Sequence, residues 1–379
     1  KYNTIVNHVA DDPIDSYVVY RLIDPGFEMW SKMGIYQRCL ENFDEKPVML
    51  NSLSRNNCMN CHSFSGNDSR TMLFHMRGNL AGTIIYRNGE IKKTDTKTDE
   101  ILSAGVYPAW HPDGRFVAFS VNNITQLFHA APEKKIEVID TRSDLILFDA
   151  ETNTVSQCES IASEGRLETF PTWSPDGRYL YFCSAEALPV SQYDERKYGL
   201  FRISFDPETQ KFGETDTVLS SARTGMSISF PGVSPDGRYI LFCMSQYGNF
   251  TIWHSDSDLY MLDTENGEME KLNINSDQAE SYHSWTSNGR WIVFGSRRSD
   301  GLFTRLWISY FSPSGETGKP FIVPQKNPTH YDTFFKSYNR PEFITTKLDL
   351  NPRILSKYAG MEPEKASFRT GNSSIREPE

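Results

Sequence analysis

One turn-and-strand motif recurs four times along the chain, and this repetition constrains the fold more than any other feature. The copies are YPAWHPDGRFVAFS from Tyr107, FPTWSPDGRYLYFCS from Phe170, FPGVSPDGRYILFCMS from Phe230 and YHSWTSNGRWIVFGS from Tyr282. Each copy has a short strand, an Asp-Gly or Asn-Gly pair, a basic residue and a second apolar strand. Because Gly and Asn tolerate positive φ, the pairs predict tight turns, so every copy predicts a β-hairpin.

Weaker copies of the motif precede and follow these four. They are CHSFSGNDSRTMLFHMRG from Cys61 and YDTFFKSYNRPEF from Tyr331, about one period beyond the last strong copy. Strand-like stretches after the hairpins supply two more strands each, and four strands make one propeller blade. We therefore expect an all-β fold, a β-propeller of six blades, with five or seven blades also compatible with the weaker copies.

The N-terminal segment supplies strands for closing the ring. SYVVYRLID, KMGIYQRCL and KPVML read as strands that no repeat claims, whereas the last copy supplies only the inner strands of its blade. Pairing the two chain ends in one blade would remove open sheet edges. We expect residues 1–57 to complete the last blade and cover one face, residues 58–358 to form the propeller, and residues 359–379 to be a polar tail whose composition is typical of disorder in isolation.

The core of the motif also carries a family resemblance. SPDGRY occurs twice intact and once as HPDGRF. From about Cys61 to Phe343, the turn-and-strand signature resembles the WD-like repeats of TolB-type six-bladed propellers. Prolyl oligopeptidase-like enzymes share this repeat, but the chain has no G-x-S-x-G nucleophile elbow, so a serine peptidase is not expected and no catalytic residue is assigned.

A second motif lies where the first blade begins. The segment NCMNCHSF holds Cys58, Cys61 and His62 in the C-x-x-C-H spacing typical of covalent c-type haem attachment. Two thiols at this spacing reach the two vinyl groups on one porphyrin edge, and the imidazole that follows can bind the iron. We expect haem c on Cys58 and Cys61, at the mouth of the channel, with His62 as the proximal ligand. The other interpretations are a disulfide or thiol redox couple, and half of a zinc site that lacks its second ligand pair.

Two further histidines are candidates for the distal side of the iron. His283 has the place in its repeat that His62 has in the first, so both would begin inner strands at one face. His75 lies on the second strand of the first blade, where a histidine satisfied within the core is an equal interpretation. A water ligand also fits, and methionine more often fills gaps in a core than binds iron, so the weaker candidates are Met59, Met72, Met76 and Met226.

Charge and hydropathy restrict the partners. Acidic residues outnumber basic ones by 49 to 39, and the net charge of −10 argues against nucleic acid. No apolar run approaches the roughly 18 residues that span a bilayer, which leaves a removed signal or a lipid anchor compatible with the chain. Haem attachment to C-x-x-C-H takes place outside the cytoplasm, and the TolB resemblance implies the same, so we expect a periplasmic or cell-surface location.

Two classes of function follow. The main expectation is electron transfer or redox sensing through the haem, with protein partners in an envelope complex. The alternative is a non-redox, TolB-like scaffold in which Cys58 and Cys61 form a disulfide. A haem peroxidase would need a distal acid or base pair, which the sequence does not show.

Overall fold

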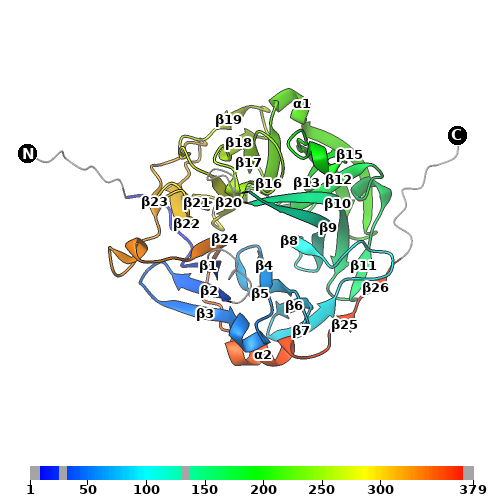
Figure 1. The fold of residues 1–379 in the computed structure, drawn as a ribbon, viewed down its shortest axis with the longest axis horizontal. Helices are drawn as coiled ribbons and strands as arrows, with labels where there is room; N and C mark the ends of the chain where they lie inside the picture. Colours follow the sequence, from blue (N-terminus) through cyan, green and yellow to red (C-terminus); the bar gives the residue numbers. More distant parts are fainter. Residues whose placement is uncertain (1–8, 25–31, 130–135, 370–379) are drawn as a thin grey trace, which may run out of the picture.

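In the part of the chain that the structure describes, the strands form six sheets arranged around a common centre (Figure 1). This arrangement comes from a computed structural model, which describes residues 9–24, 32–129 and 136–369. One end of each sheet lies toward the centre and the other toward the rim, which is the architecture of a β-propeller. The prediction of an all-β propeller is confirmed.

Four of the sheets come from the strong repeats. From the centre outward they are β8 (Val106–Trp110), β9 (Phe116–Phe128), β10 (Ile136–Asp149) and β11 (Thr154–Ser156); β12 (Arg166–Trp173), β13 (Tyr179–Glu186), β14 (Gly199–Asp206) and β15 (Lys211–Leu219); β16 (Ser227–Val233), β17 (Tyr239–Ser245), β18 (Asp258–Asp263) and β19 (Met269–Lys271); and β20 (Glu280–Trp285), β21 (Trp291–Ser296), β22 (Arg305–Tyr310) and β23 (Phe321–Ile322). A short helix, α1 (Ser221–Thr224), connects β15 to β16.

The first and last sheets meet where the ring closes. The first contains β4 (Met59–Ser65), β5 (Asp68–Met76), β6 (Gly82–Arg87) and β7 (Glu90–Asp95), and the last contains β24 (Ser337–Ile344), β1 (Tyr17–Ile23), β2 (Met33–Cys39) and β3 (Glu45–Leu50). In the last sheet β1 pairs antiparallel with β24, from Tyr17 opposite Ile344 to Ile23 opposite Ser337. The N-terminal strands therefore complete the last blade as predicted, although the C-terminal end supplies one strand rather than several.

The repeated turns have the backbone that their sequence requires. The glycines of the four Asp-Gly and Asn-Gly pairs have φ values of 70°, 71°, 77° and 67°, at Gly114, Gly177, Gly237 and Gly289. A side chain at these positions would be strained. In the second repeat the Asp176 carboxylate accepts a hydrogen bond from Ser174 Oγ at 2.6 Å, which fixes the same turn from its other side.

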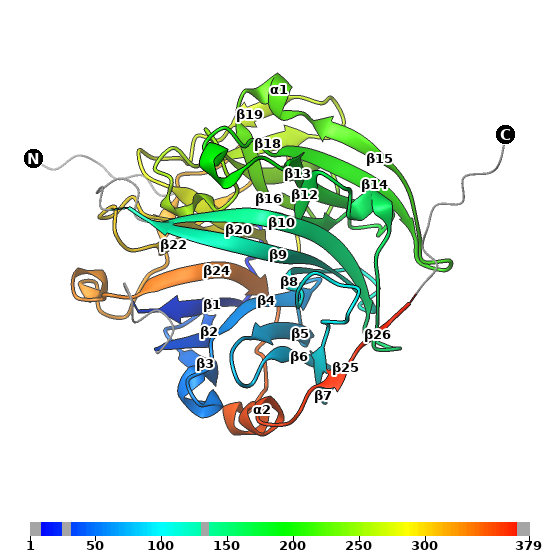
Figure 2. The ribbon, with the colours of Figure 1, turned by 45° about the vertical axis from the view of Figure 1, so that its right-hand side comes forward.

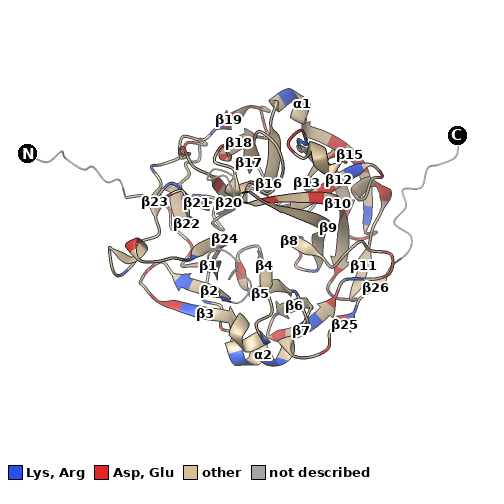
Figure 3. Ribbon diagram, in the orientation of Figure 1, with Lys and Arg blue, Asp and Glu red and all other residues tan. Residues whose placement is uncertain are grey.

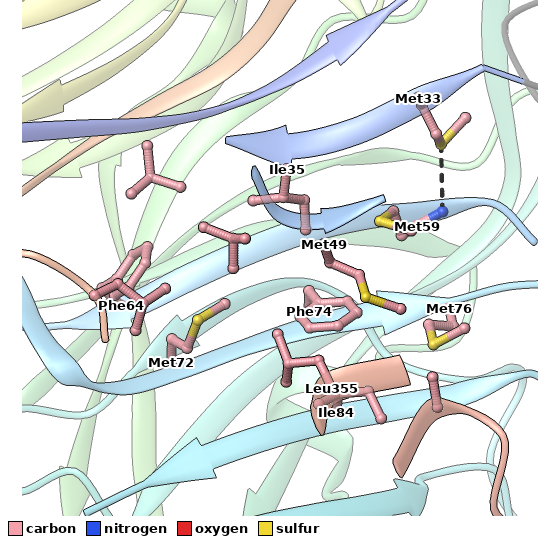
Figure 4. Close-up of a cluster of buried hydrophobic side chains, with 14 of the residues drawn as sticks. Met33, Ile35, Met49, Met59, Phe64, Met72, Phe74, Met76, Ile84 and Leu355 are labelled. Carbon is pink, nitrogen blue, oxygen red and sulfur yellow. Dashed lines mark hydrogen bonds between the residues drawn. The ribbon is translucent and has the colours of Figure 1, made fainter. Parts of the chain in front are cut away.

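Tryptophans join neighbouring sheets. Trp110, Trp173 and Trp285 each donate an indole N–H to a carbonyl oxygen of the preceding innermost strand, at 3.3, 3.1 and 3.1 Å. The rest of each junction is apolar. Figure 4 shows the cluster at the ring closure, where Ile35 of the last sheet packs with Phe74 of the first.

The C-terminal segment follows the outside of the ring. Helix α2 (Pro352–Ala359) contributes Leu355 to the cluster at the ring closure, and β25 (Glu364–Lys365) and β26 (Ser367–Phe368) add to the outer edges of two sheets by parallel pairing with β7 and β11. The tail, whose composition is typical of disorder in isolation, is held as far as Arg369 by backbone hydrogen bonds with two sheet edges. Residues 370–379 lie outside the described residues.

One hairpin is longer than the rest. Strand β9 pairs with β8 only as far as Ser120, yet β9 and β10 continue to pair with each other up to Phe128 and Ile136. Its far end lies over the centre of the ring in Figure 1 and extends beyond the neighbouring strands in Figure 2. This hairpin extends from the face at which the innermost strands begin. The sequence predicted that residues 1–57 would cover one face of the ring, and it did not predict this hairpin.

Candidate functional site

A recurring backbone feature marks the centre of the ring. One non-glycine residue near the same place in each innermost strand has a positive φ, between 43° and 55°: Cys61, Tyr107, Phe170, Phe230, Tyr282 and Arg340. Positive φ is rare for such residues, and the strand pairing in each sheet shifts register at or next to this residue. We call these six residues the axial ring.

Aromatic contacts show that the axial ring converges. The rings of Tyr107 and Phe170 lie 4.7 Å apart, those of Phe170 and Phe230 4.1 Å, and those of Phe230 and Tyr282 4.6 Å. Tyr107 and Phe230 come from sheets that are not neighbours, yet their rings are 6.3 Å apart. Such a contact places these side chains close to the axis. Cys61 and Arg340, on the adjacent innermost strands β4 and β24, hold the two remaining places.

The two cysteines of the motif have different surroundings. Cys58 is 8% exposed and belongs to the apolar cluster at the ring closure, whereas Cys61 is half-buried. Burial raises the pKa of the Cys58 thiol, against the opposing positive charges of Arg21 and Arg77. Both thiols are free, so the disulfide of the alternative interpretation is not formed here.

His62 is enclosed where the first and last sheets meet. It is 1% exposed, and its Nε2 atom is buried without a hydrogen-bond partner. Burial lowers the pKa of His62 to about 3, and the positive charges of Arg340 and Arg21 add to this effect. The imidazole is therefore neutral at physiological pH.

The two distal candidates have partners elsewhere. His283 Nε2 lies 3.1 Å from the carbonyl oxygen of Leu241 in the preceding sheet, and burial lowers its pKa to about 4. His75 Nδ1 lies 3.2 Å from Thr83 Oγ1, and burial lowers its pKa to about 3. Both are structural contacts within or between sheets. Across the described ranges no group of three or more His, Cys, Asp or Glu side chains could hold a metal ion.

These positions do not fit a c-type haem. Cys61 belongs to the axial ring, whereas Cys58 and His62 are enclosed between the first and last sheets, among core side chains such as Met59 (Figure 4). A porphyrin joined to both thiols and to His62 Nε2 would require these two sheets to separate. Haem c at Cys58 and Cys61 stays a prediction from the sequence.

Charged side chains surround this segment, although the protein's charges lie mostly on outer strands and loops (Figure 3). Arg21 Nη1 donates to the Met59 carbonyl oxygen at 3.0 Å, and Arg340 Nη2 donates to the Pro108 carbonyl oxygen at 3.2 Å. Glu342 accepts a hydrogen bond from the Phe64 backbone N–H at 2.8 Å, and burial raises its pKa to about 7. The sequence analysis missed these residues. Aligning YNRPEF with the strong repeats places Arg340 at the position of Tyr107, and this signal would have found it.

Buried polar contacts hold the long hairpin against the next sheets. Glu137 accepts a hydrogen bond from Tyr247 Oη at 2.7 Å and lies 2.9 Å from His254 Nε2. Asp140 accepts hydrogen bonds from the amides of Asn122 at 3.0 Å and Asn249 at 2.5 Å, and burial raises its pKa to about 6. These partners lie far apart in the sequence, so no local pattern indicates them.

Comparison with known proteins identifies the fold. No family model and no curated protein matches the chain. Among solved structures, TolB from Acinetobacter baumannii is 12% identical with a TM-score of 0.54, and the match covers 86% of this chain but only 66% of that one. A putative TolB from Agrobacterium tumefaciens is 14% identical with a TM-score of 0.50 and coverages of 83% and 90%. The fold is therefore that of TolB-like β-propellers. Neither described helix is long and apolar enough to span a membrane.

Proposed function

We propose that the protein is a non-catalytic interaction module of the cell envelope, which binds a protein partner on the face that carries the β9–β10 hairpin. The observation that carries this proposal is the hairpin itself. Its outer part exposes Ile124 and Phe128, which are 42% and 64% accessible. Exposed apolar side chains on a supported strand pair are typical of a surface that a partner covers.

The base of the hairpin is fixed, which suits binding. Glu137 and Asp140 are 4% and 3% exposed, and they are satisfied by Asn122 of the hairpin itself and by three side chains between β17 and β18: Tyr247, Asn249 and His254. A surface held in one conformation loses little entropy when a partner docks. The TolB-like fold supports the envelope location. Electron transfer is the weaker proposal, because the motif residues do not form a haem site.

Site-specific photo-crosslinking tests this role. A photoreactive amino acid would replace Phe128 or Ile124 in cells of the native host, and Glu208 would be the matched control. Glu208 is exposed in the β14–β15 turn, on the opposite face of the ring. We expect one discrete high-mass product from the two hairpin positions and none from Glu208. Equal products from all three positions, or none from the hairpin, would reject the proposal.

A visible absorption spectrum of natively expressed protein separates this function from the redox alternative. We expect no haem bands, because binding through the hairpin needs no cofactor. A sharp α-band after reduction would establish haem attachment at Cys58 and Cys61 and would replace the binding role by electron transfer.

A further inference from the structure

Three arginines lie around the start of the first innermost strand. Arg21 and Arg77 both act electrostatically on the Cys58 thiol, and Arg21 and Arg340 both act on His62. Among the residues that the structure describes, none of the three forms an ion pair within 4.0 Å. Arg21 Nη1 and Arg340 Nη2 instead donate to the backbone carbonyl oxygens of Met59 and Pro108, at 3.0 and 3.2 Å, which holds both guanidinium groups beside the innermost strands β4 and β8.

Unsatisfied polar atoms lie at the same place. Arg21 Nε and His62 Nε2 are buried without partners, and His62 is only 1% exposed. A buried polar atom left without a hydrogen bond costs about 1–3 kcal/mol, so a ligand that offers an acceptor to Arg21 Nε would recover part of this cost. The positive charge of Arg340 lowers the pKa of Glu342 against the larger effect of burial, but the Glu342 carboxylate accepts from the Phe64 N–H and forms no ion pair with Arg340 within 4.0 Å.

The axial ring supplies an apolar neighbour. Four of its six places hold aromatic rings, and the two that do not are Cys61 and Arg340. Arg340 donates to the carbonyl oxygen of Pro108, the residue after Tyr107, at 3.2 Å, and strand β24, which carries Arg340, contacts β20, which carries Tyr282. An anionic group at Arg340 would therefore have aromatic surface beside it.

We propose that the axial ring, at the junction of the first and last sheets, binds an organic carboxylate, held by Arg21 and Arg340 with its apolar part against Tyr107 and Tyr282. A guanidinium matches a carboxylate in shape and charge and often bonds it through two parallel hydrogen bonds. The carboxylate is either a free small molecule or the chain end of a protein partner. The second case would deepen the proposed interaction role, and the first is independent of it.

Calorimetry on the purified full chain tests the proposal with benzoate as probe and benzamide as its neutral match. We expect benzoate to bind and benzamide not to bind, and we expect Arg340→Gln and Arg21→Gln each to weaken benzoate binding at least tenfold. Arg202→Gln is the control, because Arg202 lies on the outer strand β14 and pairs with Asp216 at 3.3 Å. Equal heats from benzoate and benzamide, or unchanged binding by both test variants, would overturn the proposal.

Thiol alkylation gives a readout that does not depend on a variant folding. Cys61 and Cys158 are both half-buried, and only Cys61 belongs to the axial ring. Benzoate should slow the reaction of Cys61 with iodoacetamide several-fold and leave Cys158 unchanged. Equal rates at Cys61 with and without saturating benzoate would count against the site.

Two peptides that end in Phe distinguish the sources of the carboxylate. One would have a free C-terminal carboxylate and the other an amidated end. Binding of the free-acid peptide alone assigns a partner's chain end, whereas binding of benzoate without either peptide assigns a small molecule; both results support the carboxylate site. Equal binding of the two peptides would contradict it. Because these measurements use purified protein, their failure leaves the crosslinking result at Phe128 untouched.

Discussion

The four strong repeats and the ring closure both fill the axis and join neighbouring sheets, but they do so with different residues. In the repeats, aromatic side chains fill the axial ring and tryptophans join the sheets. At the closure, Cys61 and Arg340 hold the axial places, and Glu342 rather than a tryptophan bonds the neighbouring strand. Buried polar atoms without a hydrogen-bond partner occur in both regions, such as Arg196 Nε in the repeats and Arg21 Nε at the closure, so the difference lies in which residues hold the axial places.

This difference suggests a division of roles, in which the repeats build the ring and the closure carries the functional residues. Repetition suffices to build the ring, because each repeat supplies the same turn and three of the four supply the same tryptophan contact with a neighbouring sheet. The closure joins two chain ends that share no repeat, so its residues are free to depart from the pattern. Such departures, where a local rule is broken and a cost is accepted, are expected at functional sites.

Removing the N-terminal strands should have the largest effect on this comparison. Deleting residues 1–50 removes β1, β2 and β3, including the buried Val18, Val19 and Ile35, each of which contributes about 1.5–3 kcal/mol by burial. A domain of this kind is stable by about 5–15 kcal/mol, so we expect the ring to unfold. Deleting residues 360–379 removes only β25 and β26 from the described structure and should lower the melting temperature modestly. Equal melting temperatures for the two deletions would contradict closure by the N-terminal strands.

A pH series should test the buried carboxyl at the closure. The pKa of Glu342 rises from 4.5 to about 7 on burial, so the unfolded chain loses this proton first as the pH rises. The folded state therefore loses stability between about pH 4.5 and 7, by up to about 3 kcal/mol. Glu342→Gln should remove this loss. In urea unfolding, we therefore expect the variant to be more stable than the wild type at pH 8 and to lose this advantage at pH 4.5.

Two controls define this pH test. Glu90→Gln, on the exposed start of β7, should follow the wild type at both pH values. His62 has the opposite slope, because its lowered pKa costs stability as the pH falls from 6.5 toward 3, and comparing variant with wild type cancels that contribution. Parallel curves for Glu342→Gln and the wild type would show that the carboxyl is ordinary.

Replacing the tryptophans of the repeats should have a smaller and uniform effect. Trp110→Phe, Trp173→Phe and Trp285→Phe each remove one hydrogen bond between sheets and leave a carbonyl without its donor. We expect each variant to lose about 1–2 kcal/mol of unfolding free energy, measured in urea. Losses that differ widely among the three would show that the repeats are not equivalent.

The smallest expected effect concerns the motif cysteines. Because Cys58 and Cys61 are free, a reducing agent should leave the melting temperature unchanged. A drop of several degrees on reduction would establish the disulfide of the scaffold interpretation.

The fold was predictable from the sequence because one hairpin motif recurs along the chain. Four copies of one hairpin predicted the sheets, and strands left unclaimed at the N-terminus predicted the closure between β1 and β24. The ordered tail was not predictable, since β25 and β26 pair through backbone atoms that no side-chain pattern reports. The long β9–β10 hairpin was also not predictable, because its buried partners, such as Asn249 for Asp140, are remote in sequence.

The candidate site was predicted only in part. The C-x-x-C-H spacing located the closure, yet spacing alone does not fix the directions of side chains. A positive φ of 55° at Cys61 places this residue in the axial ring, whereas His62 next to it is enclosed. A haem motif on a helix would have its two thiols and imidazole on one side, and this bulged strand does not.

The central claim is that the repeats stabilise the ring and the closure binds the carboxylate. Two variants of the axial ring, compared for stability and for binding, test this claim most directly. Phe170→Leu changes an aromatic place within the repeats, and Arg340→Gln changes a place at the closure. We expect Phe170→Leu to lower the melting temperature and to keep benzoate affinity within twofold, and Arg340→Gln to keep the melting temperature and to lose at least tenfold in affinity. The reverse pattern, with affinity lost at Phe170 and stability lost at Arg340, would contradict the account.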